Sequence, residues 1–442
     1  MLHSDTILAL ATPAGAGALA LLRLSGPEAL SLTAAACGRT LTPRRATLVH
    51  LRDAQRRVLD TAVATYFAAP ASFTGEDTVE FCCHGGMLVV QRVTERLVAL
   101  GARPAEPGEF SRRAFENGRM DLAQAEAVMD VISAGSDVAL RAAQDQLQGE
   151  LSNRVQSAAD ALISVAAHNA AYIDFPEEDI APDTKETLLA QLASIRAQVQ
   201  ALLATADAGR VLREGVRTAI VGAPNVGKSS LLNLLLGYDR ALVSNMAGTT
   251  RDTVEETLRL RGLCLRLIDT AGLRESTDAI EQAGMERSRR AGAAADLVLE
   301  VADISRPRTP LDLPENGAKR LLILNKCDLP AHPDWAGETT ALHLCCHTGK
   351  GREELEARIE SLFLANLGEC DSLVAVNARH RHALTECDTA LARAEESLLL
   401  GESPEFTDLP LRDALEALGR ITGRIDTEDI LDRVFSTFCL GK

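Results

Sequence analysis

Aromatic residues and long apolar runs are scarce in this chain. Phe, Trp and Tyr make up 3% of its 442 residues, and there is a single Trp. No stretch of about 20 apolar residues is free of charges, which a membrane-spanning helix requires. The stretch from Ile7 to Leu22 is apolar enough to mimic a signal peptide, but Pro13 and several glycines interrupt it and no Lys or Arg precedes it. We therefore expect a cytoplasmic protein that crosses no membrane.

The cysteines form neither a disulfide framework nor a metal-binding pattern. Ten cysteines are spread over the chain, and no Cys-x-x-Cys spacing occurs. This favours reduced thiols. Two Cys-Cys-His runs, at 82–84 and 345–347, suggest zinc ligands, but adjacent side chains of a strand point to opposite faces. We interpret both runs as buried or ordinary cysteines.

Basic residues are fewer than acidic ones in this chain. The formal net charge is −16, which argues against a protein that binds nucleic acid by overall charge alone. Any RNA contact must be local or shared with a partner. Each cluster of basic residues is more commonly a solvated face; the clusters lie at 44–45 with 56–57, 112–113, 287–290 and 379–382.

The chain is too long for a single hydrophobic core. Its first 118 residues mix short strand patterns with turn signals and an amphipathic helical pattern at 87–100, which indicates an α+β domain. From Asp121 the period becomes helical, and it is helical again from 384 onward. The simplest arrangement is one helical bundle into which the intervening segment is inserted. Two separate bundles are the alternative.

The most informative stretch is a glycine-rich turn between a strand pattern and a helix pattern. Residues 222–229 read Gly-Ala-Pro-Asn-Val-Gly-Lys-Ser and precede a leucine-rich run that Gly237 can end. Such a loop curls its backbone N–H groups around an anion at the start of the helix. Lys228 would reach the outer phosphates of a nucleotide, and the Ser229 hydroxyl would complete a Mg²⁺ shell.

Two later stretches narrow the ligand to a guanine nucleotide. Residues 269–272 read Asp-Thr-Ala-Gly, where a carboxylate can hold Mg²⁺ through water and a glycine N–H can face the γ-phosphate. Residues 325–328 read Asn-Lys-Cys-Asp after an apolar strand pattern. Asp328 can accept from the ring N–H and the exocyclic amine of guanine, whereas adenine sets a lone pair against it. The sequence therefore predicts a GTPase domain.

Hydrolysis must use something other than a glutamine. Many small GTPases place a water-orienting Gln after the Asp-x-x-Gly turn, but this position is Leu273. Either hydrolysis is slow or another residue holds the water, with Arg274, Glu275 and Glu281 as polar candidates. The loop 244–252 lies where the first switch is expected, and its threonine hydroxyls can sense Mg²⁺ and γ-phosphate.

With these motifs, the chain closely resembles one family, the tRNA-modification GTPases called MnmE or TrmE. The resemblance covers essentially the whole chain, and the motifs that carry it lie at 73–77, 84–86, 103–110, 121–126, 173–176, 247–252, 269–274 and 438–442. The motifs outside the GTPase segment separate it from the GTPases of ribosome assembly.

The resemblance implies a multi-domain fold. A folate-binding and dimerising α+β domain would occupy 1–118, and an all-α helical bundle would be built from 119–212 and 372–442. An α/β P-loop GTPase domain would be inserted at 213–371. We expect Gly209 to Gly215 to form the linker into it, because two glycines flank a mixed-charge run.

The resemblance also implies an activity and partners. The chain would form a homodimer and join an FAD-dependent subunit of the MnmG or GidA type in a heterotetramer. Together they would install a carboxymethylaminomethyl group at carbon 5 of the wobble uridine of tRNA, using a one-carbon unit from 5-formyl- or methylene-tetrahydrofolate. GTP would be hydrolysed to GDP in a potassium-dependent reaction, with the two GTPase domains meeting across the nucleotides.

The family pattern also assigns residues to the nucleotide site. Glu281 would organise the attacking water, and Arg274 is a second catalytic candidate. The implied metal ligands are Asn225, Ser244, Met246 and Thr249 for K⁺ and Ser229 and Thr250 for Mg²⁺. The other implied contacts to GTP are Val226, Gly227, Lys228, Ser230, Asp269, Thr270, Ala271, Gly272, Asn325, Lys326 and Asp328.

For the folate pocket, the family positions fall on Arg23, Glu80, Arg119 and Lys442. Glu80 can take two parallel hydrogen bonds from a pterin, and a cation can pair with the glutamate tail of the folate. Arg119 stands where lysine is expected, which keeps the charge and changes the geometry. For Arg23 and Glu80, a plain ion pair is the alternative.

Two further positions have open interpretations. Cys439 can act in the one-carbon chemistry as a nucleophile or general acid, or it can be structural or dock a partner, since only a thiolate is strongly nucleophilic. Residues 345–347 read Cys-Cys-His, where the family's guanine-backing loop usually reads Ser-Ala-Arg or Ser-Ala-Lys. A rival function is a GTP-timed switch that docks on structured RNA without modifying it, although no KH-type Gly-x-x-Gly loop follows the GTPase segment.

Overall fold

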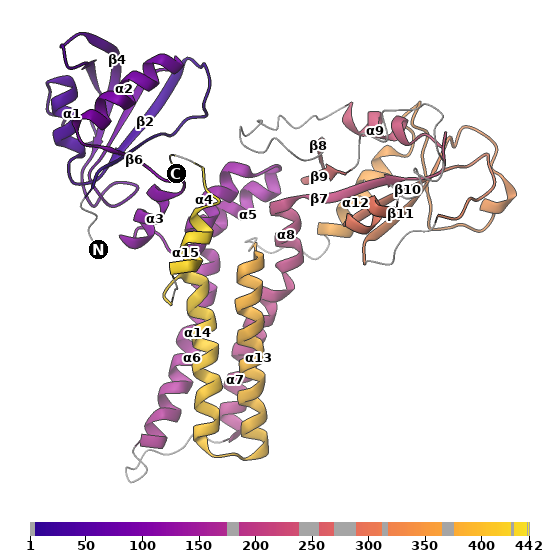
Figure 1. Ribbon diagram of the computed structural model, residues 1–442. Helices are drawn as coiled ribbons and strands as arrows, with labels where there is room; N and C mark the ends of the chain where they lie inside the picture. Colours follow the sequence, from indigo (N-terminus) through magenta and orange to yellow (C-terminus); the bar gives the residue numbers. More distant parts are fainter. Residues whose placement is uncertain are drawn as a thin grey trace. The chain divides into compact units, whose positions relative to one another are not determined.

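The computed structural model contains two compact units, residues 1–129 with 415–442 and residues 130–414. Each unit has its own six-stranded sheet (Figure 1). Among the described helices, no one combines the length and apolar character that crossing a bilayer demands. The residues that the structure describes are 5–174, 185–237, 256–268, 289–311, 317–364, 375–425, 428–439 and 441.

The sheet of the first unit has the strand order β3-β4-β5-β2-β1-β6. Its neighbouring strands pair antiparallel except β1 and β6, which are parallel. The bounds of the strands are β1 Ile7–Leu10, β2 Leu19–Ser25, β3 Thr47–Arg52, β4 Val58–Phe67, β5 Thr78–His84 and β6 Arg103–Pro104.

Two helices cover one face of this sheet, α1 (Ala29–Cys37) and α2 (Met87–Leu100), and the latter matches the predicted helical pattern (Figure 1). Strand residues alternate between the faces. Cys83 therefore lies in the core beneath the helices, and the half-buried Cys82 lies on the opposite face. Helix α3 (Glu109–Glu116) follows β6.

The carboxyl-terminal helix α15 (Glu428–Phe435) belongs to the same unit. Its Phe435 packs with Phe438 and with Leu122 of α4 (Leu122–Ser133) in a small apolar cluster. The rings of Phe435 and Phe438 meet edge to face, with centroids 5.3 Å apart. This cluster fixes the chain end that carries Cys439.

The long helices form a bundle in which segments from both ends of the second unit meet. Helix α7 packs against α6 and α13, and its predicted apolar stripe is buried at Leu192, Ile195 and Val199. Arg196 of α7 also forms ion pairs with α13 at 2.8 and 2.7 Å. The helices are α5 (Asp137–Leu147), α6 (Glu150–Asp174), α7 (Lys185–Ala204), α8 (Ala206–Glu214), α13 (Ala378–Leu400) and α14 (Pro404–Thr422).

The expected linker at 209–215 is wrong, because most of this stretch is helix α8. Gly209 lies inside the helix, and a Cβ there would come within 2.7 Å of the main chain of Val376. The glycine therefore allows close packing of two backbones. Gly215 does end the helix, with φ 78° and its N–H bonded to the carbonyl of Val211.

The second sheet has the order β12-β11-β10-β7-β9-β8 and is parallel except for the β8–β9 hairpin. The strand order reverses at β7, so the carboxyl end of β7 lies where open α/β sheets bind ligands. Helices α9 (Lys228–Leu236) and α12 (Arg352–Leu364) flank it. The strands are β7 Val216–Val221, β8 Glu256–Leu260, β9 Leu263–Leu267, β10 Leu297–Asp303, β11 Lys319–Asn325 and β12 Leu342–His343.

Candidate functional site

The loop after β7 has a backbone path that glycine makes possible. Gly222 has φ 153°, and a Cβ there would lie 2.2 Å from a main-chain oxygen of β10. Gly227 has φ 102°, and a Cβ there would lie 2.2 Å from the side-chain amide of Asn325. Asn225 also has a positive φ, 64°. The buried Val226 side chain anchors the loop in the core, so the loop is held in a tight curl at the start of α9.

Lys228 opens α9 and folds back over this loop. Its Nζ donates to the carbonyls of Gly222 and Ala223, each at 2.8 Å. Burial lowers the pKa of Lys228. A partly desolvated cation at the N-terminus of a helix favours an anionic ligand, which would be a stronger partner than two carbonyls. Ser229 and Ser230 follow with exposed side chains.

Asn325, at the end of β11, joins the phosphate loop to the loop after β12. Its Nδ2 donates to the Val226 carbonyl at 2.9 Å, and its Oδ1 accepts from the Cys346 N–H at 3.2 Å. The side chain is buried. Both ends of the amide are therefore used within the protein, and Asn325 holds three segments together beneath the site.

Lys326, the next residue, holds the phosphate loop in place through an ion pair and a hydrogen bond. Its Nζ lies 2.6 Å from Asp303 Oδ2 and donates to the Asn225 carbonyl at 3.2 Å. Burial opposes ionisation of Asp303, but hydrogen bonds from Lys326 and Ser305 outweigh it and hold the pKa of Asp303 below its usual range. Sequence reasoning missed Asp303. Its position at the carboxyl end of a strand of this sheet was the available signal.

Asp328 lies exposed at the rim of the site. A hydrogen bond from the Cys345 thiol is the first cause that lowers its pKa. The carboxylate is therefore an ionised acceptor, as recognition of two N–H donors requires. The Cys327 N–H bonds to the Leu344 carbonyl at 3.2 Å, which ties the two loops together.

Part of the predicted nucleotide site, and one residue of the folate pocket, lie outside the described residues. Their assigned roles stay predictions; the residues are Ser244, Met246, Thr249, Thr250, Asp269, Thr270, Ala271, Gly272, Arg274, Glu281 and Lys442.

In the first unit, Arg23 of β2 and Glu80 of β5 are paired across neighbouring strands. Arg23 Nε and Nη2 both lie 2.9 Å from Glu80 Oε1, so the two do form an ion pair. The rings of Phe73 and Phe110 lie 5.2 and 5.6 Å from the Arg23 guanidinium carbon. The pair therefore lies beside aromatic walls on the sheet face opposite α1 and α2.

The other predicted folate-pocket residues have looser connections. Arg23 Nη1 is 3.5 Å from the carbonyl of Gly441, which places the chain end beside this pair. The exposed Arg119 lies over Gly75, where a Cβ would be 3.2 Å from its Cγ. Cys439 is half-buried, and its carbonyl accepts from the Gly108 N–H at 3.4 Å.

The solvated face expected at 112–113 is wrong for Arg113, whose side chain is fully buried. Its Nη2 lies 2.8 Å from Asp5 and 3.0 Å from Glu109, and its Nη1 lies 3.2 Å from Glu76. Arg103 bonds to the same Asp5 and Glu109. Burial opposes ionisation of Glu109, but its hydrogen bonds outweigh this effect and lower its pKa. The hydrogen bond from Arg103 contributes most to the lowering.

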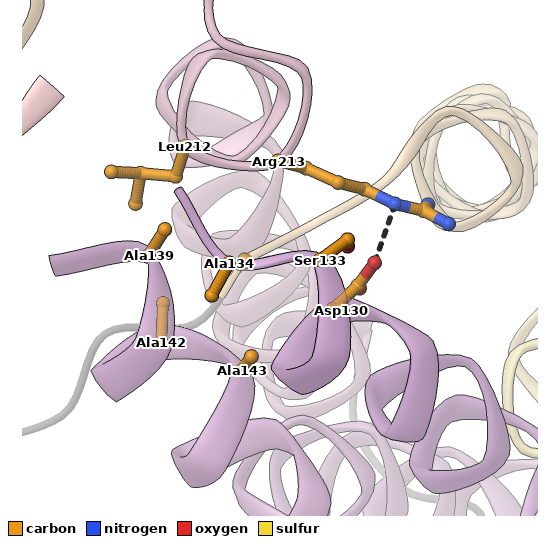
Figure 2. A pocket seen from close by; sticks show the side chains of 9 residues that line it. Asp130, Ser133, Ala134, Ala139, Ala142, Ala143, Leu212 and Arg213 are labelled. Atoms are coloured by element: carbon orange, nitrogen blue, oxygen red, sulfur yellow. Dashed lines mark ion pairs between the residues drawn. The ribbon is translucent and has the colours of Figure 1, made fainter. Parts of the chain in front are cut away.

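A separate pocket lies in the second unit between the end of α4, α5 and α8 (Figure 2). At its edge, Arg213 Nε lies 2.7 Å from Asp130 Oδ1. None of the predicted site residues lines this pocket. Small side chains make most of its wall; the lining is Asp130, Ser133, Ala134, Ala139, Ala142, Ala143, Leu212, Arg213 and Ala375.

Comparison with known proteins agrees with this geometry. The family model for the MnmE helical domain matches residues 122–439, and the model for the GTP-binding protein TrmE N-terminus matches residues 6–119. Together with the two sheets and the bundle, these matches confirm the predicted multi-domain fold, with an α+β domain, a helical domain and a P-loop GTPase domain.

Full-length relatives carry one name, tRNA modification GTPase MnmE. The protein of Akkermansia muciniphila is 60% identical over 444 residues and that of Opitutus terrae 46% over 451, with 99% of each chain covered. The protein of Alkaliphilus metalliredigens is 41% identical over 461 residues, with 100% of both chains covered. This chain therefore belongs to the MnmE family of tRNA modification GTPases.

Proposed function

We propose that this chain is a potassium-dependent, cytoplasmic GTPase that works with an FAD-dependent subunit of the MnmG or GidA type. The complex installs a carboxymethylaminomethyl group at carbon 5 of the wobble uridine of tRNA, with a one-carbon unit from 5-formyl- or methylene-tetrahydrofolate. The proposed nucleotide binding rests on the side-chain amide of Asn325, which forms hydrogen bonds with both the phosphate loop and the loop after β12.

The residues at the phosphate loop fit a nucleotide triphosphate and its metal ions. The Lys228 ammonium group, which donates to two main-chain carbonyls, would bind the phosphates instead. The Asp328 carboxylate would accept hydrogen bonds from guanine. Ser229 and Thr250 would hold Mg²⁺, which would neutralise negative charge on the phosphates. The exposed Asn225 would be a K⁺ ligand, with Ser244, Met246 and Thr249.

Water activation is assigned to Glu281, because Leu273 has no hydrogen-bonding group. The glutamate would orient water for in-line attack on the γ-phosphate, and Arg274 remains a second candidate. A monovalent cation near the phosphates would supply the charge that an arginine finger supplies in other GTPases.

The pair formed by Arg23 and Glu80 fits a folate. Both bonds from Arg23 go to Glu80 Oε1, while Oε2 accepts from no residue in the described part of the chain. Oε2 is therefore available to a pterin N–H donor. Phe73 and Phe110 offer flat apolar walls beside the pair. Arg119 and Lys442 are assigned to the glutamate tail, and Cys439 to the one-carbon step.

The same sheet face supports homodimerisation. Leu48, Val63, Cys82 and Leu21 are register partners across four strands, opposite the helix-covered face. Leu48 and Val63 are 59% and 41% exposed. An uncovered apolar row is typical of a protein interface, and we assign it to a second copy of this chain.

Folate binding separates this proposal from the rival RNA-binding switch. We expect 5-formyltetrahydrofolate to bind the full-length chain in calorimetry and Glu80→Ala to abolish binding, because the pterin loses its carboxylate acceptor. Glu95→Ala, which removes an exposed carboxylate from α2, is the matched control and should bind normally. Wild-type protein that binds GTP but no reduced folate would favour the switch.

A further inference from the structure

Four large apolar side chains lie exposed at the turn that joins α13 to α14, at one end of the helical bundle (Figure 1). Leu399 and Leu400 end α13, and Phe406 and Leu409 lie in the first turns of α14. Their exposed fractions are 61, 70, 65 and 64%. Single exposed apolar residues are ordinary, but a group of them is typical of an interaction site. We call these four residues the turn patch.

The backbone under the turn patch is well defined. Gly401 ends α13 in the left-handed conformation, with φ 69°, and its N–H donates to the Leu398 carbonyl at 3.2 Å. The N–H of Glu402 donates to the Ser397 carbonyl at 3.2 Å, which completes the Schellman motif. Pro404 then opens α14 with a fixed φ. A surface with such a backbone loses little conformational entropy when a partner binds.

Two other helices brace the same turn. Asn169 of α6 donates from Nδ2 to the Pro404 carbonyl at 3.1 Å. Lys185 of α7 donates from Nζ to the Leu399 carbonyl at 2.8 Å. Both hydrogen bonds go to main-chain oxygens, so they hold the turn while its apolar side chains stay exposed. Four helices therefore support the turn patch in one arrangement.

The surroundings of the turn patch carry a surplus of negative charge. Two exposed arginines beside it are already paired, Arg393 with Asp413 and Arg412 with Asp408, each at 2.7 Å. Three exposed glutamates form an acidic rim; they are Glu396, Glu402 and Glu405. A partner that covers the patch must therefore bring positive charge to this rim.

We infer that the turn patch is the docking surface for the FAD-dependent subunit, which meets it with apolar side chains set among Lys and Arg. This rests on the proposed function, in which the chain has three partners: the subunit, tRNA and a second copy. The acidic rim repels the phosphates of tRNA. In a symmetric contact between two copies, the same glutamates would face each other. Of the three partners, the subunit is the one that this chemistry leaves.

The chain's own segment 175–184 is a poor cover for the patch. It connects α6 to α7 and lies outside the described residues. It contains four acidic residues and no basic one. Because the rim of the patch is also acidic, repulsion between like charges opposes docking of this segment.

The first test measures binding of the purified FAD-dependent subunit to the full-length chain by calorimetry. We expect Phe406→Ala combined with Leu409→Ala to weaken binding at least about 10-fold, because a few large side chains carry most of the binding free energy of an interface. Both side chains are exposed, so this double variant should melt at the wild-type temperature. Leu88→Ala, which shortens an exposed leucine of α2 in the first unit, is the matched control and should bind normally.

The second test reverses the charge of the rim. Glu396→Lys combined with Glu402→Lys should weaken binding of the subunit about 5-fold or more at low salt. The loss should shrink as salt is added, because salt screens exposed charges. Glu353→Lys combined with Glu354→Lys makes the same change of charge on α12 and is the matched control. Binding that is unchanged or tighter after reversal of the rim would contradict a basic partner surface.

The possible failures are distinguishable. If the wild-type chain binds no FAD-dependent subunit, the proposed partnership is wrong and the inference falls with it. If the wild-type chain binds the subunit and the Phe406 and Leu409 double variant binds it equally well, the inference alone is wrong. In that case, a smaller mass of the variant in light scattering would assign the patch to a second copy, weaker tRNA binding would assign it to tRNA, and a lower melting temperature would assign it to residues 175–184.

Discussion

Arg113 carries its charge inside the first unit, where water cannot solvate it. Its guanidinium meets Glu76 and two other carboxylates at 2.8 to 3.2 Å. Such a buried pair contributes little net stability relative to apolar residues, but breaking it leaves an uncompensated charge. The three segments that supply these residues are therefore held in one arrangement.

We predict that Arg113→Met destabilises the first unit by about 3 kcal/mol, because Glu76 is left buried and unpaired. Denaturant unfolding measures the change. Arg92→Met, which removes an exposed partner of Glu95, is the control and should cost less than about 0.5 kcal/mol.

The same network gives a pH dependence. The pKa of Glu109 is lowered in the folded state, so its stabilising contribution is present above the unfolded value, about 4.3. It is lost as pH falls below that value toward the folded pKa. The wild-type unfolding free energy should therefore drop more steeply below about pH 4 than that of Arg113→Met. Parallel profiles would contradict this assignment.

The sequence marks these residues without revealing that they meet. Glu76 lies in the motif at 73–77 and Glu109 in the motif at 103–110, but Glu76 and Arg113 are 37 positions apart. No periodicity links residues that three separate segments bring together. The neighbouring Arg112, by contrast, is partly exposed and pairs with Glu116. Two adjacent arginines thus differ because of tertiary packing alone.

At the scale of elements, the β8–β9 hairpin touches α5 through small residues. The hairpin turns at Arg261 and Gly262, both with positive φ, as a tight hairpin turn requires. A Cβ on Gly262 would lie 2.8 Å from a methyl group of Val138, and a Cβ on Gly135 would lie 3.1 Å from the Cys264 sulfur. The hairpin of the GTPase sheet is therefore in close contact with the start of α5.

We predict that Gly262→Ala destabilises the second unit by about 1–3 kcal/mol, through backbone strain and the clash with Val138. Adding Val138→Ala should recover the part due to the clash, so the double-mutant cycle shows coupling. Gly349→Ala is the control for backbone strain alone, since Gly349 has a similar φ and a Cβ there would meet no atom within 4 Å. Strictly additive effects in thermal unfolding would contradict the contact.

Long periodic elements follow directly from the sequence, and short irregular ones do not. The stripe along α7 and the helix at 87–100 are as expected, because a regular apolar period needs no tertiary information. Helix α8 was misread as a linker because its glycine signals a break in the local pattern. Only the approach of Val376 explains why glycine stands inside that helix.

At the scale of the whole molecule, the uncovered row on the first sheet predicts self-association. Leu48→Glu with Val63→Glu should convert a dimer to a monomer in light scattering, because both side chains are exposed and apolar in the single chain. Leu88→Glu, which adds a charge at an exposed apolar residue of α2 away from this row, tests whether charge alone acts. A wild-type chain that is monomeric at all concentrations would contradict the proposed dimer.

The GTPase cycle is the central claim, and the rate of GTP turnover in K⁺ and in Na⁺ at equal ionic strength tests it most directly. We predict turnover at least roughly tenfold faster in K⁺, because a correctly placed cation stabilises charge on the phosphates in the transition state. Asn225→Ala should remove most of this advantage while leaving GTP binding nearly intact. Equal rates in the two salts for the wild-type protein would contradict the account.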